Sequence, residues 1–270
     1  MTLTKEKEMK SIVEIMKIAK MPDGSPEIYL AVQGEGKTIG TPIVFVRCSV
    51  CNLHCVWCDT FYTWNFEGTP YAHDFAPKVN VVYEQMDMTP EEVVKAIKKA
   101  AGEKVKAAVF TGGEPTIQQK HLVKVAELLD NGWYFEIETN GTIKLIPEFI
   151  EKIHQINCSP KLATSGNDLK SLRDRPEVIA QFIDLAESHG KGLCFKFVVT
   201  AHREEQDIAE IEEWIKEHNV PEKYIYLMPE GTKRDRIIEG SLRLNEICMQ
   251  KGWKMSTRLQ VILYGEKRAV

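Results

Sequence analysis

Short apolar runs alternate with amphipathic stretches along most of the chain, and this alternation limits the fold more than any other feature. The apolar runs are rich in β-branched and aromatic residues and read IVFVRC (43–48), VKAAVF (105–110), YFEIET, INCSP, LCFKFVV and YIYLM. Strands that alternate with helices form right-handed β-α-β units and hence a parallel sheet. The sequence therefore predicts an α/β protein with about six β/α units between residues 42 and 251.

Six units are fewer than the eight that close a β/α barrel. We therefore expect an open, partial TIM-like barrel with flanking strands at both ends, at residues 27–33 and 257–264. We interpret residues 27–270 as a single domain that follows an N-terminal extension, residues 1–26, whose SIVEIMKIA segment fits either a helix or an extra strand. Residues 64–88 are long for a connection and fit either a lid or ordinary packing.

Charge and hydropathy narrow the classes of function. The 270 residues carry a formal net charge of −4, whereas a nucleic-acid-binding protein normally shows a basic surplus. No apolar stretch approaches the roughly 20 residues of a membrane-spanning helix, and the first ten residues lack the apolar core of a secretory signal. We therefore expect a cytoplasmic protein without nucleic-acid or membrane partners. In that reducing compartment, the seven cysteines indicate metal ligands, reactive thiols or core residues before disulfides.

The unusual residues of the chain follow the ends of the predicted strands. Cysteines follow IVFVR, TGGEP follows VKAAVF, ETNGT follows YFEI, and SPK follows INC. Parallel β/α folds gather their binding residues at the C-terminal ends of the strands. The sequence therefore predicts one functional site at that edge of the sheet.

Three cysteines form the pattern Cys-x3-Cys-x2-Cys at Cys51, Cys55 and Cys58. Three thiolates on one short loop can hold three irons of a 4Fe–4S cluster and leave the fourth iron open to a ligand. Electron-transfer clusters use four cysteines, and a structural zinc ion needs four closed ligands. The rival fourth ligands in this loop are Cys48 and His54.

The position of Cys48 in its strand favours a structural role for its thiol. In strand alternation Cys48 shares one face with Val44 and Val46, whereas Arg47 shares the other face with Phe45. A cysteine among valines is typical of a protein core. Arg47, beside an aromatic ring, needs an anionic partner and offers a planar fork that suits a carboxylate.

The cysteine pattern resembles the signature of the radical S-adenosylmethionine superfamily. The resemblance implies that the open iron chelates the amino and carboxylate groups of S-adenosylmethionine, and that one electron from the cluster cleaves the sulfonium to a 5′-deoxyadenosyl radical. The sequence Thr111-Gly112-Gly113-Glu114-Pro115 matches the glycine-rich turn of that superfamily, whose backbone meets the methionine amino group. Glycine suits a place where backbone and ligand approach closely.

A longer series of motifs is similar to the 7-carboxy-7-deazaguanine synthase family, over residues from about Glu27 to the C-terminus. The motifs are, in order, QGEG (33–36), Gly40-x-Pro42, Phe45-x-Arg47, the three cysteines, Asp59-Thr60, ETNGT (138–142), Ser159-Pro160-Lys161 and RLQVILYGEKRAV. The resemblance implies a carbon–nitrogen lyase that converts 6-carboxy-5,6,7,8-tetrahydropterin to 7-carboxy-7-deazaguanine with loss of ammonia, in queuosine and deazapurine biosynthesis. It also implies Mg²⁺, a homodimer and an electron donor of the flavodoxin or ferredoxin type.

The same resemblance implies roles for individual residues. Cys51, Cys55 and Cys58 would hold the cluster at the catalytic centre, and Thr60 would ligate Mg²⁺. S-adenosylmethionine would contact Trp57, Cys58, Asp59, Gly113, Glu114, Ser159, Lys161, Met228, Pro229, Glu230 and Gly231. The pterin would contact Val32, Gln33, Gly34, Glu35, Arg47, Thr111, Glu138 and Val270.

Two other functions remain open at this point. A radical-generating activase, which acts on a partner protein, would share the cysteine pattern and the GGE turn. A non-catalytic four-cysteine cluster or zinc protein would use Cys48 as its fourth ligand. The role of Glu138 is also open, since its carboxylate could bind substrate or ribose, or pair with a neighbouring cation.

Overall fold

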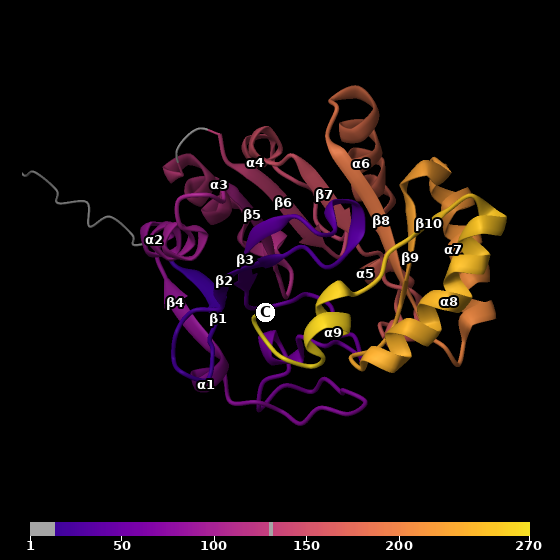
Figure 1. The fold of residues 1–270 in the computed structure, drawn as a ribbon, viewed down its shortest axis with the longest axis horizontal. Coiled ribbons are helices and arrows are strands. Elements are labelled where there is room, and N and C mark those ends of the chain that lie inside the picture. Colours follow the sequence, from indigo (N-terminus) through magenta and orange to yellow (C-terminus); the bar gives the residue numbers. More distant parts are fainter. Residues whose placement is uncertain (1–13, 130–131) are drawn as a thin grey trace, which may run out of the picture.

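The computed structural model describes residues 14–129 and 132–270, and within them a single open sheet organises the chain (Figure 1). The strand order is β10-β9-β8-β7-β6-β5-β3-β1-β4, with β2 paired to β3. Besides the two-residue edge strand β10, six of these strands are parallel: β3 (Pro42–Cys48), β5 (Ala107–Gly112), β6 (Tyr134–Thr139), β7 (Gln155–Cys158), β8 (Gly192–Val199) and β9 (Ile225–Pro229). The predicted open partial barrel with six β/α units is confirmed.

Antiparallel strands extend the sheet beyond β3. The flanking strand predicted at residues 27–33 is β2 (Ile28–Val32), which pairs with β3. The end of the SIVEIMKIA segment is also a strand, β1 (Met16–Ala19), which lies between β3 and β4 (Gln85–Met88). Residues 1–13 of the predicted extension lie outside the described residues.

The strand predicted at residues 257–264 is wrong. The flanking strand at this end is β10 (Lys254–Met255), parallel to β9, and the chain then forms the helix α9 (Leu259–Tyr264). A short apolar run fits helix and strand equally well by periodicity. Here β10 already occupies the edge of β9, and the Leu259 N–H donates to the Gly34 carbonyl at 2.9 Å. Residues 259–264 therefore form a helix held by this tertiary contact and not a further strand.

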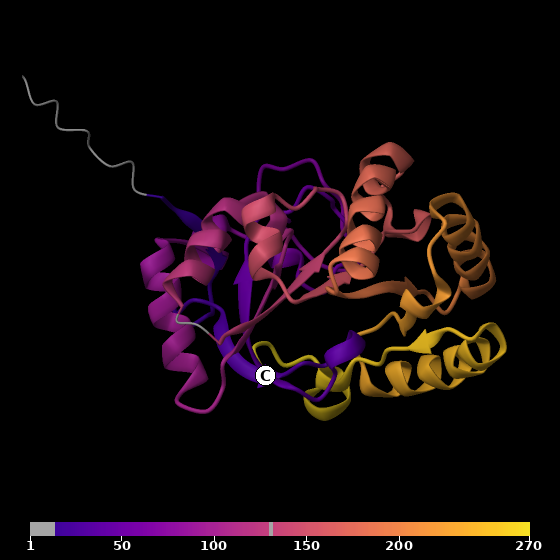
Figure 2. The same ribbon diagram turned by 90° about the horizontal axis from the view of Figure 1, so that it is seen from above.

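Helices cover the outer face of the curved sheet (Figure 2). The longer ones are α2 (Pro90–Ala101), α3 (Gln119–Leu128), α4 (Pro147–Lys152), α6 (Pro176–Ser188), α7 (Glu204–His218) and α8 (Arg234–Lys251), and the short ones are α1 (Val81–Glu84) and α5 (Lys170–Arg173). Helix α2 begins with a capping box, in which Thr89 and Glu92 satisfy each other's backbone N–H groups. In the part of the chain that is described, no helix is long and apolar enough to span a bilayer.

Strand alternation separates an apolar outer face from a polar inner face. Val44, Val46 and Cys48 of β3 pack into the core beneath the helices, as predicted, while Arg47 faces the interior of the curve. The pattern recurs on β6, β7 and β8, whose inner faces carry Glu136, Glu138, Asn157 and Lys196. The open barrel therefore encloses a polar cavity.

Candidate active site

A cavity of about 690 Å³ lies at the C-terminal ends of the parallel strands. It collects motifs that are far apart in the sequence, because the ends of parallel strands meet at one edge of the sheet. The predicted residues that line it are Val32, Gln33, Gly34, Glu35, Arg47, Cys51, Cys55, Trp57, Cys58, Asp59, Thr60, Thr111, Gly113, Glu138, Ser159, Lys161, Met228, Pro229, Glu230, Gly231 and Val270. Glu114 alone among the predicted site residues is absent from this lining.

Glu114 lies behind the cavity wall and acts on it indirectly. Its carboxylate is fully buried and accepts hydrogen bonds from Thr116, from the Thr139 hydroxyl at 2.8 Å and from the Asn140 N–H at 2.7 Å. Burial raises the pKa of Glu114. The neighbouring Gly113 packs so tightly that a Cβ atom there would lie 2.1 Å from the Val50 carbonyl oxygen. This turn therefore fixes the loop that carries the cysteines.

The three cysteines of the motif all face the cavity from the loop after β3. Each sulfur has a polar side chain nearby: Asn140 Nδ2 at 4.0 Å from Cys51 Sγ, Asn167 Nδ2 at 3.4 Å from Cys55 Sγ and Thr60 Oγ1 at 3.5 Å from Cys58 Sγ. Burial raises the pKa of the Cys55 thiol to about 11 and raises those of Cys51 and Cys58 as well. A bound cation is what would hold these thiols deprotonated at neutral pH.

The spacing of the sulfur atoms fits a cluster better than a single ion. Among the described residues, only Asp174, Glu217 and His218 bring three potential His, Cys, Asp or Glu ligand atoms within 4.8 Å of one another, so at least one pair of the three cysteine sulfurs is further apart than that. A tetrahedral zinc ion with Zn–S bonds of about 2.3 Å would hold its sulfurs closer together. The irons of a 4Fe–4S cluster occupy separate corners and take more widely spaced thiolates.

Neither rival fourth ligand faces the cysteine loop as a ligand would. Cys48 is fully buried in the core under the helices, where burial raises the pKa of its thiol to about 12. The His54 ring stacks on Tyr71, with ring centroids 3.3 Å apart, and burial lowers its pKa to about 4. The donor set in the cavity is therefore three cysteines.

The segment predicted as a lid or packing lies against the cysteine loop. His73 Nε2 lies 2.9 Å from the Cys58 carbonyl oxygen, and the Asp74 N–H donates to the Val56 carbonyl at 2.8 Å. An isolated bridge between Phe66 and Val79 closes the segment on itself. These contacts support the packing interpretation.

Polar side chains line the cavity on both sides of the cysteine loop. On one side, Glu138 accepts hydrogen bonds from Gln33 Nε2 at 3.2 Å and from the Thr111 hydroxyl at 3.4 Å. On the other side, Lys161 Nζ donates to Ser159 Oγ at 2.9 Å and lies 5.7 Å from the centre of the Trp57 ring. Each of these two sets of side chains contains residues from different sequence motifs.

A buried ion-pair network around Glu35 contains residues that sequence reasoning missed. The Glu35 carboxylate pairs with Lys196 of β8, with Arg258 Nε at 3.1 Å and with Gln260 Nε2 at 2.7 Å. Arg258 also pairs with Asp59 and donates to the Gly231 carbonyl. Burial would raise the pKa of Glu35, but Lys196 and Arg258 outweigh burial and lower it. Lys196 could have been found from the sequence, because a lysine stands out within the apolar run LCFKFVV.

The anionic partner that Arg47 requires is already present in the chain. Arg47 Nε donates to Glu27 Oε1 at 3.1 Å, and Arg47 Nη2 donates to the Tyr29 hydroxyl at 3.0 Å. Glu27 is fully buried and also accepts from the Tyr62 hydroxyl at 3.0 Å and from Arg268 Nε at 2.8 Å. Glu27 thus holds two guanidinium groups at once.

Arg268 anchors the C-terminal tail over the cavity. Besides Glu27, it pairs with Glu84 at 2.9 Å, donates to the Lys20 carbonyl at 2.8 Å and lies 3.5 Å from the centre of the Tyr62 ring. The tail that it holds, residues 265–270, lines the cavity. Figure 1 shows this yellow segment running from α9 to the C-terminus. Residues 265–270 therefore form one wall of the site.

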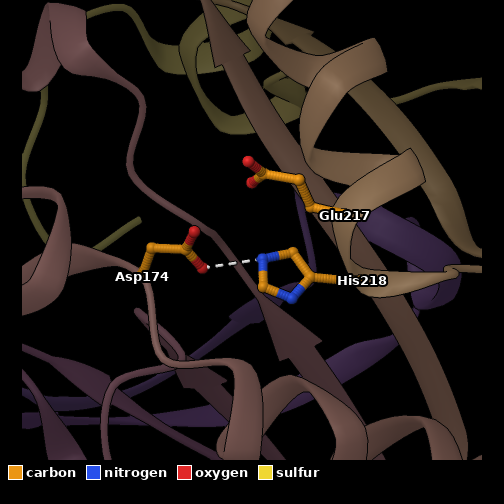
Figure 3. A group of neighbouring side chains, drawn as sticks. All are labelled: Asp174, Glu217 and His218. Carbon is orange, nitrogen blue, oxygen red and sulfur yellow. Dashed lines mark ion pairs between the residues drawn. The ribbon is translucent and has the colours of Figure 1, made fainter.

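A second cluster of potential ligands lies outside the cavity. Asp174, Glu217 and His218 converge between the ends of α5 and α7, with His218 Nε2 2.9 Å from Asp174 Oδ1 (Figure 3). Asp174 also accepts from Trp214 Nε1 at 3.2 Å, and Lys170 Nζ lies 2.7 Å from Glu217 Oε2. Lys170 balances the negative charge, so we interpret the cluster as a structural ion-pair group.

Comparison with known proteins agrees with this site. Residues 46–239 match the Radical SAM superfamily. The chain is 30% identical over 243 residues to a 7-carboxy-7-deazaguanine synthase of Pyrobaculum aerophilum, covering 90% of this chain and 95% of that protein. It is 26% identical over 233 residues to the enzyme of that name from Escherichia coli K12, covering 85% and 93%. The crystal structure of QueE from Escherichia coli has the same fold, with a TM-score of 0.59, 24% identity and coverage of 90% and 93%.

The open β/α barrel with its cavity-facing three-cysteine loop belongs to the radical SAM superfamily, whose members use a 4Fe–4S cluster and S-adenosylmethionine. Within that superfamily, the chain belongs to the 7-carboxy-7-deazaguanine synthase family. Membership of this family sets aside the activase and the zinc-protein alternatives.

The contacts of Arg268 predict that this residue holds the C-terminal tail in place. Changing Arg268 to Gln removes a charged hydrogen-bond donor to Glu27 and Glu84, a loss of about 1.5–3 kcal/mol that raises the open fraction of the tail at least about ten-fold. Carboxypeptidase should then release Val270 correspondingly faster, because cleavage follows the open population. Lys267→Gln is the matched control, since the Lys267 side chain is exposed. Equal release rates for both variants would contradict the anchoring role.

Proposed function

We propose that this chain converts 6-carboxy-5,6,7,8-tetrahydropterin to 7-carboxy-7-deazaguanine, with loss of ammonia, in deazapurine biosynthesis. One observation carries the proposal. The QGEG, Arg47, cysteine, TGGEP, ETNGT and SPK motifs together span more than a hundred residues of the sequence, yet all contribute to one cavity of about 690 Å³. A radical enzyme needs its cluster, S-adenosylmethionine and substrate side by side, and this cavity supports that arrangement.

We assign the cluster to Cys51, Cys55 and Cys58, whose chemistry fits it. The cluster and S-adenosylmethionine supply, when bound, a one-electron cleavage that starts the radical reaction. The polar groups next to the sulfurs, among them Asn140 and Asn167, donate hydrogen bonds to thiolates and thereby stabilise their negative charge. The segment packed against the loop holds the backbone of the loop through its contacts with the Cys58 and Val56 carbonyls.

The S-adenosylmethionine site is proposed at the Lys161 side of the cavity. The Lys161 ammonium is a point charge for the methionine carboxylate, and Ser159 Oγ fixes its position. Gly113 brings its backbone to the cavity surface, and the turn from Met228 to Gly231 supplies the opposite wall. Asp59 and Glu230 line the same space, although the Asp59 carboxylate is paired with Arg258.

The pterin site is proposed at the Arg47 side of the cavity. Glu138 presents an acceptor for the N–H groups of a pterin ring, and Gln33 and Thr111 hold that carboxylate in place. Val32, Gly34 and the tail residue Val270 enclose the ring position. Glu35 shapes this wall through its ion pairs, which leave it little capacity for a direct substrate contact.

Further parts of the proposal rest on the family resemblance. They are an electron donor of the flavodoxin or ferredoxin type, a homodimer and a cytoplasmic location. Thr60 is proposed to ligate Mg²⁺ together with substrate oxygens, which suits an ion that prefers oxygen ligands and binds few protein groups.

The reaction is tested by mass spectrometry of the products after anaerobic incubation with 6-carboxytetrahydropterin, S-adenosylmethionine and a reductant. The proposal requires 7-carboxy-7-deazaguanine and ammonia in equal amounts. Cleavage of S-adenosylmethionine without any deazapurine would keep the superfamily assignment and reject the substrate.

Cluster assembly depends on three cysteines in this proposal. Changing Cys51, Cys55 or Cys58 to Ala should abolish cluster assembly and S-adenosylmethionine cleavage, because each removes the only protein ligand of one iron. Cys48→Ser should keep the iron, with a loss of stability from a polar group in the core. Iron and sulfide analysis after anaerobic reconstitution measures the cluster content of each variant. Loss of iron from Cys48→Ser alone would reverse the ligand assignment.

Magnesium dependence tests the role of Thr60. Thr60→Ala should lower turnover and remove most of the stimulation by Mg²⁺, because the hydroxyl is its proposed protein ligand. The absorption spectrum of the cluster should remain, since the hydroxyl only adjoins Cys58 Sγ at 3.5 Å. Equal stimulation of wild type and variant by Mg²⁺ would reject Thr60 as a ligand.

A further inference from the structure

Two of the three nitrogens of Arg47 donate hydrogen bonds to other side chains, and in the described part of the chain the third has no partner. Its Nε is bonded to Glu27 and its Nη2 to the Tyr29 hydroxyl. Within residues 14–129 and 132–270, no acceptor is bonded to Arg47 Nη1. Because Arg47 lines the cavity, this nitrogen is the part of the guanidinium that remains for an anion.

Tyr29 has an unused donor at the same place. A guanidinium group can only donate, so the Tyr29 oxygen is the acceptor in its hydrogen bond with Arg47 Nη2. The hydroxyl proton of Tyr29 therefore has no acceptor in the described part of the chain, although Tyr29 lines the cavity. Burial raises the pKa of Tyr29, so this proton stays in place at neutral pH.

The Tyr29 hydroxyl is held rigidly in this position. Tyr29 and Phe45 are register partners on β2 and β3, and their rings stack at 5.3 Å between centroids with 9° between planes. Glu27 competes little for either donor, because its two oxygens already accept from Arg47, Tyr62 and Arg268. A rigid pair of donors, one charged and one neutral, suits a planar carboxylate.

We infer that Tyr29 is a specificity-determining residue that binds the substrate carboxylate together with Arg47. Arg47 Nη1–H donates to one carboxylate oxygen, and the Tyr29 O–H donates to the other. The inference rests on the proposed function, since it takes the 6-carboxylate of the pterin as the ligand. It makes Glu27 a positioning residue, which acts on the substrate only by orienting Arg47.

The test compares the affinities of the reconstituted enzyme for 6-carboxytetrahydropterin and for a tetrahydropterin without the 6-carboxylate, with S-adenosylmethionine present. Tyr29→Phe removes the hydroxyl and keeps the stacked ring. A hydrogen bond to a charged group is worth about ten-fold or more in affinity. We expect Tyr29→Phe to weaken binding of the carboxylated pterin by about that factor and to leave binding of the other pterin within two-fold.

The matched control is Tyr62→Phe. It also deletes one tyrosine hydroxyl next to Glu27, but that hydroxyl already donates to Glu27 at 3.0 Å. Tyr62→Phe should therefore change the affinities for both pterins equally. Iron content of each variant reports whether the site has assembled.

Two outcomes separate this inference from the proposed function. If Arg47→Lys loses the preference for the carboxylated pterin while Tyr29→Phe retains it, the role of Tyr29 is overturned and the proposed substrate stands. If the wild type binds both pterins equally well, the proposed substrate site and the inference fail together.

Discussion

The buried carboxylate of Glu27 is the interaction on which the cavity depends. It joins Arg47 of β3, Tyr62 beside the cysteine loop and Arg268 of the tail, three segments that are far apart in the sequence. An unpaired carboxylate in that place would cost several kcal/mol. Loss of either arginine therefore affects Glu27 and, through it, the other arginine. The substrate side of the cavity, which contains Arg47, and its outer wall, which contains Arg268, are stabilised together.

A second acid, which is mostly buried, acts in the same way at the other end of β2. Glu27 precedes β2 and pairs with Arg268, while Glu35 follows β2 and pairs with Arg258. The C-terminal segment is thus fastened at both ends of one strand. Lys196 adds a cation from β8, which links the far side of the open barrel to the same acid. These ion pairs connect parts of the open barrel that additional strands would connect in a closed barrel.

Local patterns in the sequence predicted most of the fold and most of the cavity lining. Alternation in IVFVRC placed Cys48 in the core and Arg47 in the cavity, because the two faces of a strand are fixed by its period of two residues. The run RLQVILY was predicted as a strand and is the helix α9, since a contact to Gly34 lies outside any local window. The roles of Glu27, Glu35 and Arg258 were out of reach for the same reason. The Glu27–Arg268 and Glu35–Arg258 pairs join residues more than two hundred positions apart, and no local pattern records such a pair.

The attachment of the tail also sets an order of events during synthesis. The cysteine loop precedes Arg258 and Arg268 in the sequence and therefore leaves the ribosome before they do. Protein domains fold as the chain emerges, beginning with the N-terminal part. The cavity therefore gains the wall formed by residues 265–270 after the cysteine loop has emerged, and iron and sulfide that arrive earlier meet a site that is still open on that side.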